Sequence, residues 1–219
     1  MNQMLAIFDI DGTICDTQDI EGICYAQAYS GVFNQSLETV DWSKFEDPTS
    51  AGIIRSLCGN MSDFGIRETR FKERFVQLLK EKQPHHPGDF SPLPGAVDFM
   101  KQLSDDYGYR IAFATGGFDT EAEFKLACCG IELSAYAHAT SSDTPKRTDI
   151  IRLATQRAQS ELTEVVYFGD APWDVVACQS LGIPMIGIGR RINQLEQLGI
   201  EHVFRNYSKP NDIIGVLDL

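Results

Sequence analysis

The sequence has no excess of basic residues and no long apolar run. It holds 19 Lys and Arg against 31 Asp and Glu, which gives a formal net charge of −12. Such a charge repels nucleic acid and anionic lipid at long range, and no basic tract offers contacts to a phosphate backbone. We therefore exclude a nucleic-acid-binding protein. No apolar run approaches the roughly 18 residues of a membrane-spanning helix, so no membrane partner is expected either.

Cysteines at CxxC spacing and a basic N-terminal region are also missing. The six cysteines form no CxxC pair, and most of them fall in apolar stretches, which favours reduced thiols. The first residues do not resemble a signal peptide. Both observations predict a cytoplasmic protein. With 43% apolar, 10% aromatic and 23% charged residues, the chain has the composition of an ordinary globular protein with a real core.

Short apolar runs alternate with helical patterns along much of the chain, which predicts a doubly wound α/β fold around a parallel sheet. Edge strands are expected at residues 136–139 and 202–204. The buried strands are predicted at Leu5–Phe8, Ile111–Ala114, Val165–Phe168 and Met185–Ile188. The helices beside them are predicted at Gly95–Asp105, Thr120–Cys129, Pro145–Gln159 and Pro172–Leu181.

The interval between the first two strands is too long for one βαβ unit, which needs only roughly 30 residues. Residues 16–86 instead show helical patterns and no convincing strand. The longest pattern runs from Asp63 to Lys82, with apolar residues at helical spacing. We predict that residues 16–86 form an all-helical cap, and that residues 1–15 and 87–219 form the α/β core.

Polar residues follow the predicted strands at their carboxyl ends, where doubly wound sheets bind ligands. Asp9 and Asp11 follow the first strand in the run FDIDGT, Thr115 follows the second, and Asp170 follows the third. Carboxylates gathered this closely repel one another unless a cation binds between them. Because an oxygen-rich cluster suits a hard ion, the pattern predicts a Mg²⁺ site.

Two further residues have both a structural and a functional interpretation. Lys146 follows Thr144 and Pro145, which have the residue types of a helix N-cap and first position. A cation in a first helical turn opposes the helix dipole, so an acid should lie nearby. Asp174 would be a first-turn acid of the helix beginning at Pro172, which is an adequate structural explanation by itself.

Taken together, these residues resemble the four motifs of haloacid dehalogenase superfamily hydrolases in order and spacing. The resemblance covers the whole core, which it implies to be Rossmann-like, and the helical insert is similar to the cap of many members. Phosphoglycolate phosphatases are the members that it most resembles. The residues that carry it are Asp9, Asp11, Thr115, Lys146, Asp170 and Asp174.

The resemblance implies a role for each motif residue. Asp9 becomes the nucleophile that forms an aspartyl phosphate, and Asp11 becomes the general acid and base. Thr115, the N–H of Gly116 and Lys146 bind the transferring phosphoryl group. The implied Mg²⁺ site draws on Asp9, Asp11, Asp170 and Asp174, with the backbone carbonyl of Asp11 as the expected ligand.

Two positions depart from the common family pattern. Arg147 follows Lys146 where many relatives have proline, and Gly116 stands where many have asparagine. The first departure leaves an alternative open, because the guanidinium fork of Arg147 also suits phosphate. Asp174 would hold Lys146 or a metal-bound water.

The expected function is a Mg²⁺-dependent phosphatase acting on a small phosphorylated metabolite, as a monomer or homodimer. A sugar-phosphate mutase of the same superfamily is the alternative, since it uses the same acid and base. A phospho-acceptor or binding protein without turnover is a further alternative. In the cap, Arg55 is either a contact for a substrate anion or a surface arginine with a packed stem. Trp42 is assigned to packing alone.

Overall fold

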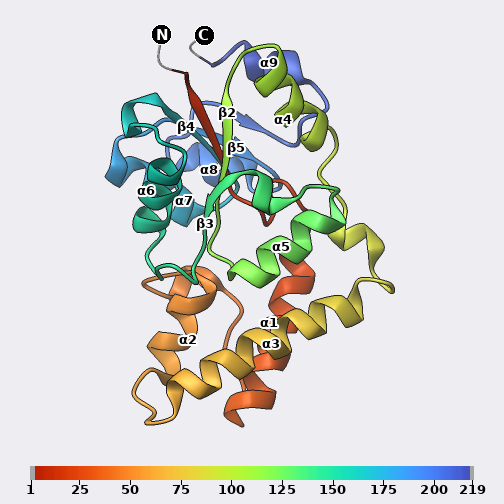
Figure 1. The fold of residues 1–219 in the computed structure, drawn as a ribbon, viewed down its shortest axis with the longest axis vertical. Helices are drawn as coiled ribbons and strands as arrows, with labels where there is room; N and C mark the ends of the chain where they lie inside the picture. The colour runs from red at the N-terminus through yellow and green to blue at the C-terminus, as the bar shows by residue number, and fades with distance from the viewer. Residues whose placement is uncertain (1–2, 218–219) are drawn as a thin grey trace.

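The computed structural model describes residues 3–217. Within them the strands form one six-stranded parallel sheet in the order β3-β2-β1-β4-β5-β6 (Figure 1). Both β2 and β4 pair with β1, so the winding direction reverses at β1. The predicted doubly wound α/β fold is therefore confirmed. The strands are β1 (Leu5–Phe8), β2 (Arg110–Ala114), β3 (Ala137–Ala139), β4 (Val165–Gly169), β5 (Met185–Ile188) and β6 (Val203–Phe204).

Helices cover both faces of this sheet (Figure 1). Because side chains alternate along a strand, Ala6 and Phe8 pack on one face against α4, while Leu5 and Ile7 pack on the other against α6 and α7. Burial on both faces explains why the strands are continuous apolar runs. The α-helices outside the insert are α4 (Ala96–Asp105), α5 (Asp119–Cys128), α6 (Arg147–Arg157), α7 (Pro172–Leu181), α8 (Ile192–Gln197) and α9 (Pro210–Ile214).

The insert between β1 and β2 is helical, and residues 16–86 contain no strand. Its helices are α1 (Gln18–Phe33), α2 (Ser50–Cys58) and α3 (Phe64–Lys82), which lie beyond one end of the sheet (Figure 1). They share an apolar cluster in which Tyr25 packs edge-on against Phe71 and Phe75, with ring centroids 4.8 and 5.4 Å away. Phe118 of the core joins the same cluster. The boundaries drawn at residues 15/16 and 86/87 stay a prediction.

The start of α6 differs from the sequence prediction, and this changes which residue faces the site. The helix expected from Pro145 begins at Arg147, and Lys146 is its N-cap residue. Lys146 has extended backbone there, with φ −91° and ψ 120°. Elsewhere the agreement is close, and β3 and β6 lie at the two sheet edges as expected. Among residues 3–217 no helix combines the length and apolar character needed to span a membrane.

Candidate active site

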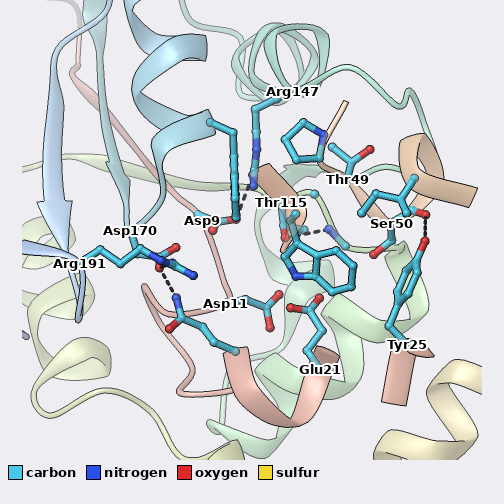
Figure 2. A pocket seen from close by; sticks show the side chains of 17 residues that line it. Asp9, Asp11, Glu21, Tyr25, Thr49, Ser50, Thr115, Arg147, Asp170 and Arg191 are labelled. Carbon is cyan, nitrogen blue, oxygen red and sulfur yellow. Dashed lines mark hydrogen bonds and ion pairs between the residues drawn. The ribbon is translucent and has the colours of Figure 1, made fainter. Parts of the chain in front are cut away.

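The pocket lies at the carboxyl ends of β1, β2 and β4, where the cap helices α1 and α2 face the core (Figure 2). Its cavity volume is about 70 Å³. Predicted strand-end residues and cap residues both line it. The core contributes Asp9, Asp11, Thr115, Gly116, Gly117, Arg147, Asp170, Trp173 and Arg191. The insert contributes Gln18, Glu21, Tyr25, Trp42, Pro48, Thr49, Ser50 and Ile53.

Asp9 follows β1 and is only 3% exposed. Its N–H donates to the carbonyl of Phe168 in β4 at 2.9 Å, which holds the backbone as the strand ends. Arg147 donates from Nη1 to its Oδ1 at 3.2 Å. Burial raises the pKa of Asp9 to about 7; Arg147 opposes this, and the charges of Asp174 and Asp11 add to it. A further cation beside Asp9 would therefore be stabilising.

Asp170 directly follows β4 and is 2% exposed. Its carboxylate accepts hydrogen bonds from Arg191, which follows β5, and from Gln18 at the start of α1 (Figure 2). Burial raises the pKa of Asp170 well above its usual range, although the Arg191 guanidinium acts in the opposite direction. Core and cap thus meet on one buried carboxylate.

Asp174 lies in the first turn of α7 and is fully buried. Its carboxylate accepts the N–H of Ala171 at 3.1 Å and the hydroxyl of Tyr167 at 3.2 Å. Arg147 approaches the same carboxylate, with Nε 3.4 Å from Oδ1. Asp174 therefore caps its helix, as the structural interpretation expected, and also anchors the arginine that reaches Asp9.

These three aspartates bring carboxylate oxygens within 4.8 Å of one another, and we call Asp9, Asp170 and Asp174 the Arg147 group. All three are buried, and burial raises the pKa of both Asp9 and Asp170. Two arginines thus leave the group short of positive charge. A buried, oxygen-only donor set with this deficit fits a hard divalent cation.

The loop after β1 depends on a glycine. Gly12 has φ +77°, in the left-handed region that glycine adopts most easily. A Cβ at this position would crowd the side-chain amide of Gln18 and the carboxylate of Asp170. Both are ends of side chains that can move, so the glycine in FDIDGT is required mainly by its backbone conformation.

Asp11 belongs to a different set of carboxylates. Its Oδ1 lies 2.7 Å from the ammonium of Lys125, and the hydroxyl of Thr17 donates to it as well. Lys125 is fully buried and also contacts Glu21 at 3.1 Å and Glu121 at 3.0 Å. We call Asp11, Glu21 and Glu121 the Lys125 group. Although burial opposes its charged form, these carboxylates raise the pKa of Lys125 well above its usual value.

This arrangement limits how Asp11 could serve a metal. Its side chain lies with Lys125 and not among the oxygens of the Arg147 group. Any metal contact from Asp11 would then come from its backbone carbonyl, which stays a prediction. The Lys125 group already has an ammonium at its centre, so its carboxylates are paired with a cation that the chain itself supplies.

Thr115 and Gly116 follow β2 and border Arg147. The hydroxyl of Thr115 accepts the N–H of Gly117 at 3.2 Å. A Cβ on Gly116 would lie 3.2 Å from Nη2 of Arg147 and 3.4 Å from Cα of Thr49 in the cap. Glycine at 116, where many relatives have asparagine, thus lets the arginine and the cap approach the strand end together.

A short cap segment closes over these strand ends. The N–H of Ser50 donates to the carbonyl of Gly116 at 2.7 Å, and the hydroxyl of Thr49 donates to the carbonyl of Pro145 at 2.7 Å. Tyr25 of α1 supports the segment by donating to the carbonyl of Ser50 at 2.8 Å. The cap is therefore attached to the core at the pocket itself.

The structure does not bring Lys146 to the site. Its side chain is exposed and does not line the pocket, whereas Arg147 is 8% exposed and contacts Asp9. The physical reason is the later start of α6: Lys146 has extended backbone as the N-cap, and the next residue takes the inward-facing position. The cation expected beside the acids is thus Arg147, the alternative that the sequence left open.

Of the two alternatives for Arg55, the structure places it as a surface arginine. It does not line the pocket; it lies on the exposed side of α2 and pairs with Glu68 of α3 at 3.3 Å. The buried face of α2 contains Ile53 and Ile54 instead, which turns Arg55 away from the core. Trp42, assigned to packing, lines the pocket while also packing on Tyr25 at 5.2 Å between ring centroids.

Sequence reasoning missed several pocket residues. Arg191 could have been found, because it follows β5 in the run GIGRR and strand ends are where ligands bind. Lys125 carried no such signal, since Glu121 and Lys125 have the i, i+4 spacing of a common surface pair. Glu21 likewise stands at the start of an ordinary helical pattern. Nothing in the sequence marks these charges as buried together.

The chain is similar to several known proteins in sequence and fold. A phosphoglycolate phosphatase from Agrobacterium fabrum is 25% identical over 196 residues, covering 84% of this chain and 79% of the relative. A hydrolase from Pseudomonas syringae has a TM-score of 0.76 at 24% identity, covering 99% and 98% of the two chains. CbbY from Rhodobacter sphaeroides in complex with phosphate has a TM-score of 0.73 at 18% identity, covering 95% and 96%.

A family model also matches most of the chain. The model of haloacid dehalogenase-like hydrolases matches residues 6–188, which spans the loop after β1, the insert, and the site residues that follow β2 and β4. With that extent, and with the acids of the motifs gathered at the strand ends, the chain belongs to the haloacid dehalogenase-like hydrolases.

Proposed function

We propose that this hydrolase is a Mg²⁺-dependent phosphatase that cleaves a small phosphorylated metabolite through an aspartyl phosphate on Asp9. The observation that carries the proposal is the buried Asp9 carboxylate, which faces the pocket beside Arg147 and close to Asp170 and Asp174. The similarity to a phosphoglycolate phosphatase from Agrobacterium fabrum supports the reaction class. Asp9, Asp170 and Asp174 would hold the ion, Asp174 directly or through a water.

In the first step an oxygen of Asp9 attacks phosphorus, and the bond from phosphorus to the leaving oxygen breaks. Arg147 fixes the Asp9 carboxylate and neutralises charge on the phosphoryl oxygens. The Thr115 hydroxyl and the Gly116 N–H would bind the same oxygens. Bound Mg²⁺ supplies further charge neutralisation to carboxylate and phosphate.

Asp11 acts on protons in both steps. Protonated, it donates to the leaving alcohol oxygen; ionised, it accepts a proton from the water that attacks the aspartyl phosphate. That second step regenerates Asp9 and releases inorganic phosphate. Lys125 and Thr17 hold the Asp11 carboxylate in one orientation, which suits a group that must serve two steps from the same position.

The proposal is tested by trapping the covalent intermediate. With p-nitrophenyl phosphate, whose leaving group needs no protonation, Asp11→Asn should form the aspartyl phosphate but hydrolyse it slowly. Acid quenching and mass spectrometry of the peptide containing Asp9 should then show added phosphate, and Asp9→Asn should show none. Absence of the adduct in Asp11→Asn, together with unchanged turnover, would remove this mechanism.

A sugar-phosphate mutase remains the alternative, because the same residues transfer a phosphoryl group between two hydroxyls. Hexose phosphates assayed both for free phosphate and for isomerised sugar separate the two. Net phosphate release without isomerisation supports the phosphatase. Isomerisation without net phosphate release supports the mutase.

A further inference from the structure

The cap side of the pocket lacks positive charge. Among the described residues that line the pocket, none contributed by the insert is Lys or Arg. Arg55, the cap cation suggested by the sequence, pairs with Glu68 outside the pocket. The cap side chains that do line it bring a carboxylate, hydroxyls, an indole, an amide and apolar groups, from Gln18, Glu21, Tyr25, Trp42, Pro48, Thr49, Ser50 and Ile53.

The two arginines that line the pocket belong to the core and are already paired. Arg147 bridges Asp9 and Asp174. Arg191 pairs with Asp170 and lies over the ring of Trp173, with its guanidinium carbon 5.7 Å from the ring centroid. A second anion on the substrate, beyond the phosphate, would therefore find no uncommitted cation among the described residues of the pocket wall.

Glu21 adds a carboxyl group to the cap side of the pocket. It lies in the pocket next to Asp11, and one of its oxygens comes within 4.8 Å of an Asp11 oxygen (Figure 2). Lys125 contacts its Oε1, and among the described residues no hydrogen bond reaches Oε2. A carboxyl group keeps acceptor capacity in either protonation state, so Glu21 can accept a hydrogen bond from a group bound in the pocket.

The part of the pocket next to the aspartates is small. At about 70 Å³ it has room for about five to seven water-sized atoms, at about 10–15 Å³ each. A phosphoryl group takes most of that space, and the remainder accommodates the leaving-group atoms nearest the ester oxygen, beside Glu21. Beyond them the pocket adjoins a second cavity of about 660 Å³, which Trp42 and Arg191 also line.

From this juxtaposition we propose that the leaving group is a small alcohol with a hydrogen-bond donor and no second anion, and that Glu21 accepts the donor. The donor is a hydroxyl or an ammonium group. The inference rests on the proposed phosphatase function and narrows its substrate class. A carboxylate in the same place, as in phosphoglycolate, would lie beside the Lys125 group, whose three carboxylates share one ammonium, and this excess of negative charge opposes its binding.

The test compares wild-type kcat/KM, with Mg²⁺, for four esters: p-nitrophenyl phosphate, phosphoglycolate, glycerol 1-phosphate and phosphoethanolamine. We expect glycerol 1-phosphate or phosphoethanolamine to exceed phosphoglycolate by about 10-fold or more, and the better of the two identifies the donor. Phosphoglycolate as the best of the three metabolites overturns the inference but leaves the phosphatase standing. Hydrolysis of p-nitrophenyl phosphate alone also overturns it. No hydrolysis of any ester overturns the phosphatase itself.

A variant then tests Glu21 directly. Glu21→Gln should raise the KM for the preferred donor-bearing ester by about 10-fold and shrink its advantage over phosphoglycolate. Glu73→Gln is the matched control, because Glu73 is exposed on α3 and does not line the pocket; it should change neither value. If Glu21→Gln lowers kcat/KM for all esters equally, Glu21 has a structural role and the specificity assignment is wrong.

Discussion

Two sets of acidic residues border the same pocket, and they differ in what neutralises them. The Arg147 group brings together Asp9, Asp170 and Asp174, with arginines reaching in from its edge. The Lys125 group surrounds an ammonium that contacts every one of its carboxylates. Both sets have carboxylates close enough to hold an ion.

The comparison teaches that a gathering of carboxylates does not by itself define a metal site. Lys125 is a compact charge with three donors, which matches three carboxylates. Arg147 is a planar fork bound to two of the three aspartates in its group, and the pKa of Asp9 stays raised to about 7 despite it. We infer that a metal ion belongs to the Arg147 group and that the Lys125 group acts without one.

Loss of the nucleophile should have the largest effect. Asp9→Asn keeps the shape of the side chain but removes the attacking oxygen charge, so phosphate release should fall by about 10⁴-fold or more. Release of inorganic phosphate measures this, and circular dichroism checks that the variant is folded. Turnover near the wild-type rate would contradict the role of Asp9.

Removal of Lys125 should break the second group. Lys125→Met leaves one buried and two partly buried carboxylates without their ammonium, and we expect a loss of about 3–5 kcal/mol of unfolding free energy in urea titrations. Lys101→Met is the matched control, since Lys101 is exposed and pairs with exposed Asp105, and its loss should change the unfolding free energy far less. If millimolar Mg²⁺ restored the unfolding free energy of Lys125→Met, this group would also bind a metal, and the proposed difference between the two groups would be wrong.

Adjacent residues test which cation serves the site. Arg147→Ala should reduce kcat/KM by about 10²-fold or more, because Asp9 loses its buried partner and the phosphate loses a charged donor. Lys146→Ala, the same change one residue earlier on an exposed side chain, should stay within about twofold of wild type. Steady-state kinetics with one ester measures kcat/KM for both variants. A larger loss in Lys146→Ala than in Arg147→Ala would restore the sequence-based assignment of Lys146.

Metal dependence should separate the two groups further. Asp170→Asn should raise the Mg²⁺ concentration needed for half-maximal activity by about 10- to 100-fold, since the Arg147 group loses an ionised oxygen ligand. Glu121→Gln should leave that concentration unchanged. Equal increases in both variants would show that Mg²⁺ activation does not distinguish the groups.

Stability of the metal-free protein should depend on pH in a direction set by Asp9. Its pKa is raised from 3.8 to about 7 in the folded state, so the native state binds the proton more tightly than the unfolded state. The stability from this group is fully present below about pH 4 and is lost as pH rises through about 7. Melting temperature in EDTA should therefore increase from pH 8 to pH 6, by about 2–4 °C for each kcal/mol.

Asp9→Asn should flatten this pH dependence, because the group no longer titrates, and Mg²⁺ added at pH 8 should stabilise the wild type. Other buried acids contribute with the same sign, so the difference between wild type and Asp9→Asn isolates Asp9. A melting temperature that falls from pH 8 to pH 6 in the wild type, with no difference in Asp9→Asn, would contradict the burial argument.

The sequence by itself determined the architecture and the positions of the acids. Side chains alternate between the two faces of the sheet, and because both faces are buried, each strand is a continuous apolar run. The bounds of β1 and β5 were predicted to the residue. Asp9, Asp11, Thr115 and Asp170 were predicted because strand ends in a doubly wound fold meet at one edge, which is a consequence of topology and not of side-chain detail. The long interval after β1 likewise predicted the helical insert.

Tertiary structure alone decided how these charges are paired. Whether Lys146 or Arg147 turns inward depends on one residue in the start of α6, a boundary that local pattern does not fix to that precision. Lys125, Glu21 and Glu121 come from two helices that contact only after the cap packs on the core. Which buried charges pair depends on which helices come together in the folded protein, and the spacing of residues in the sequence does not show this.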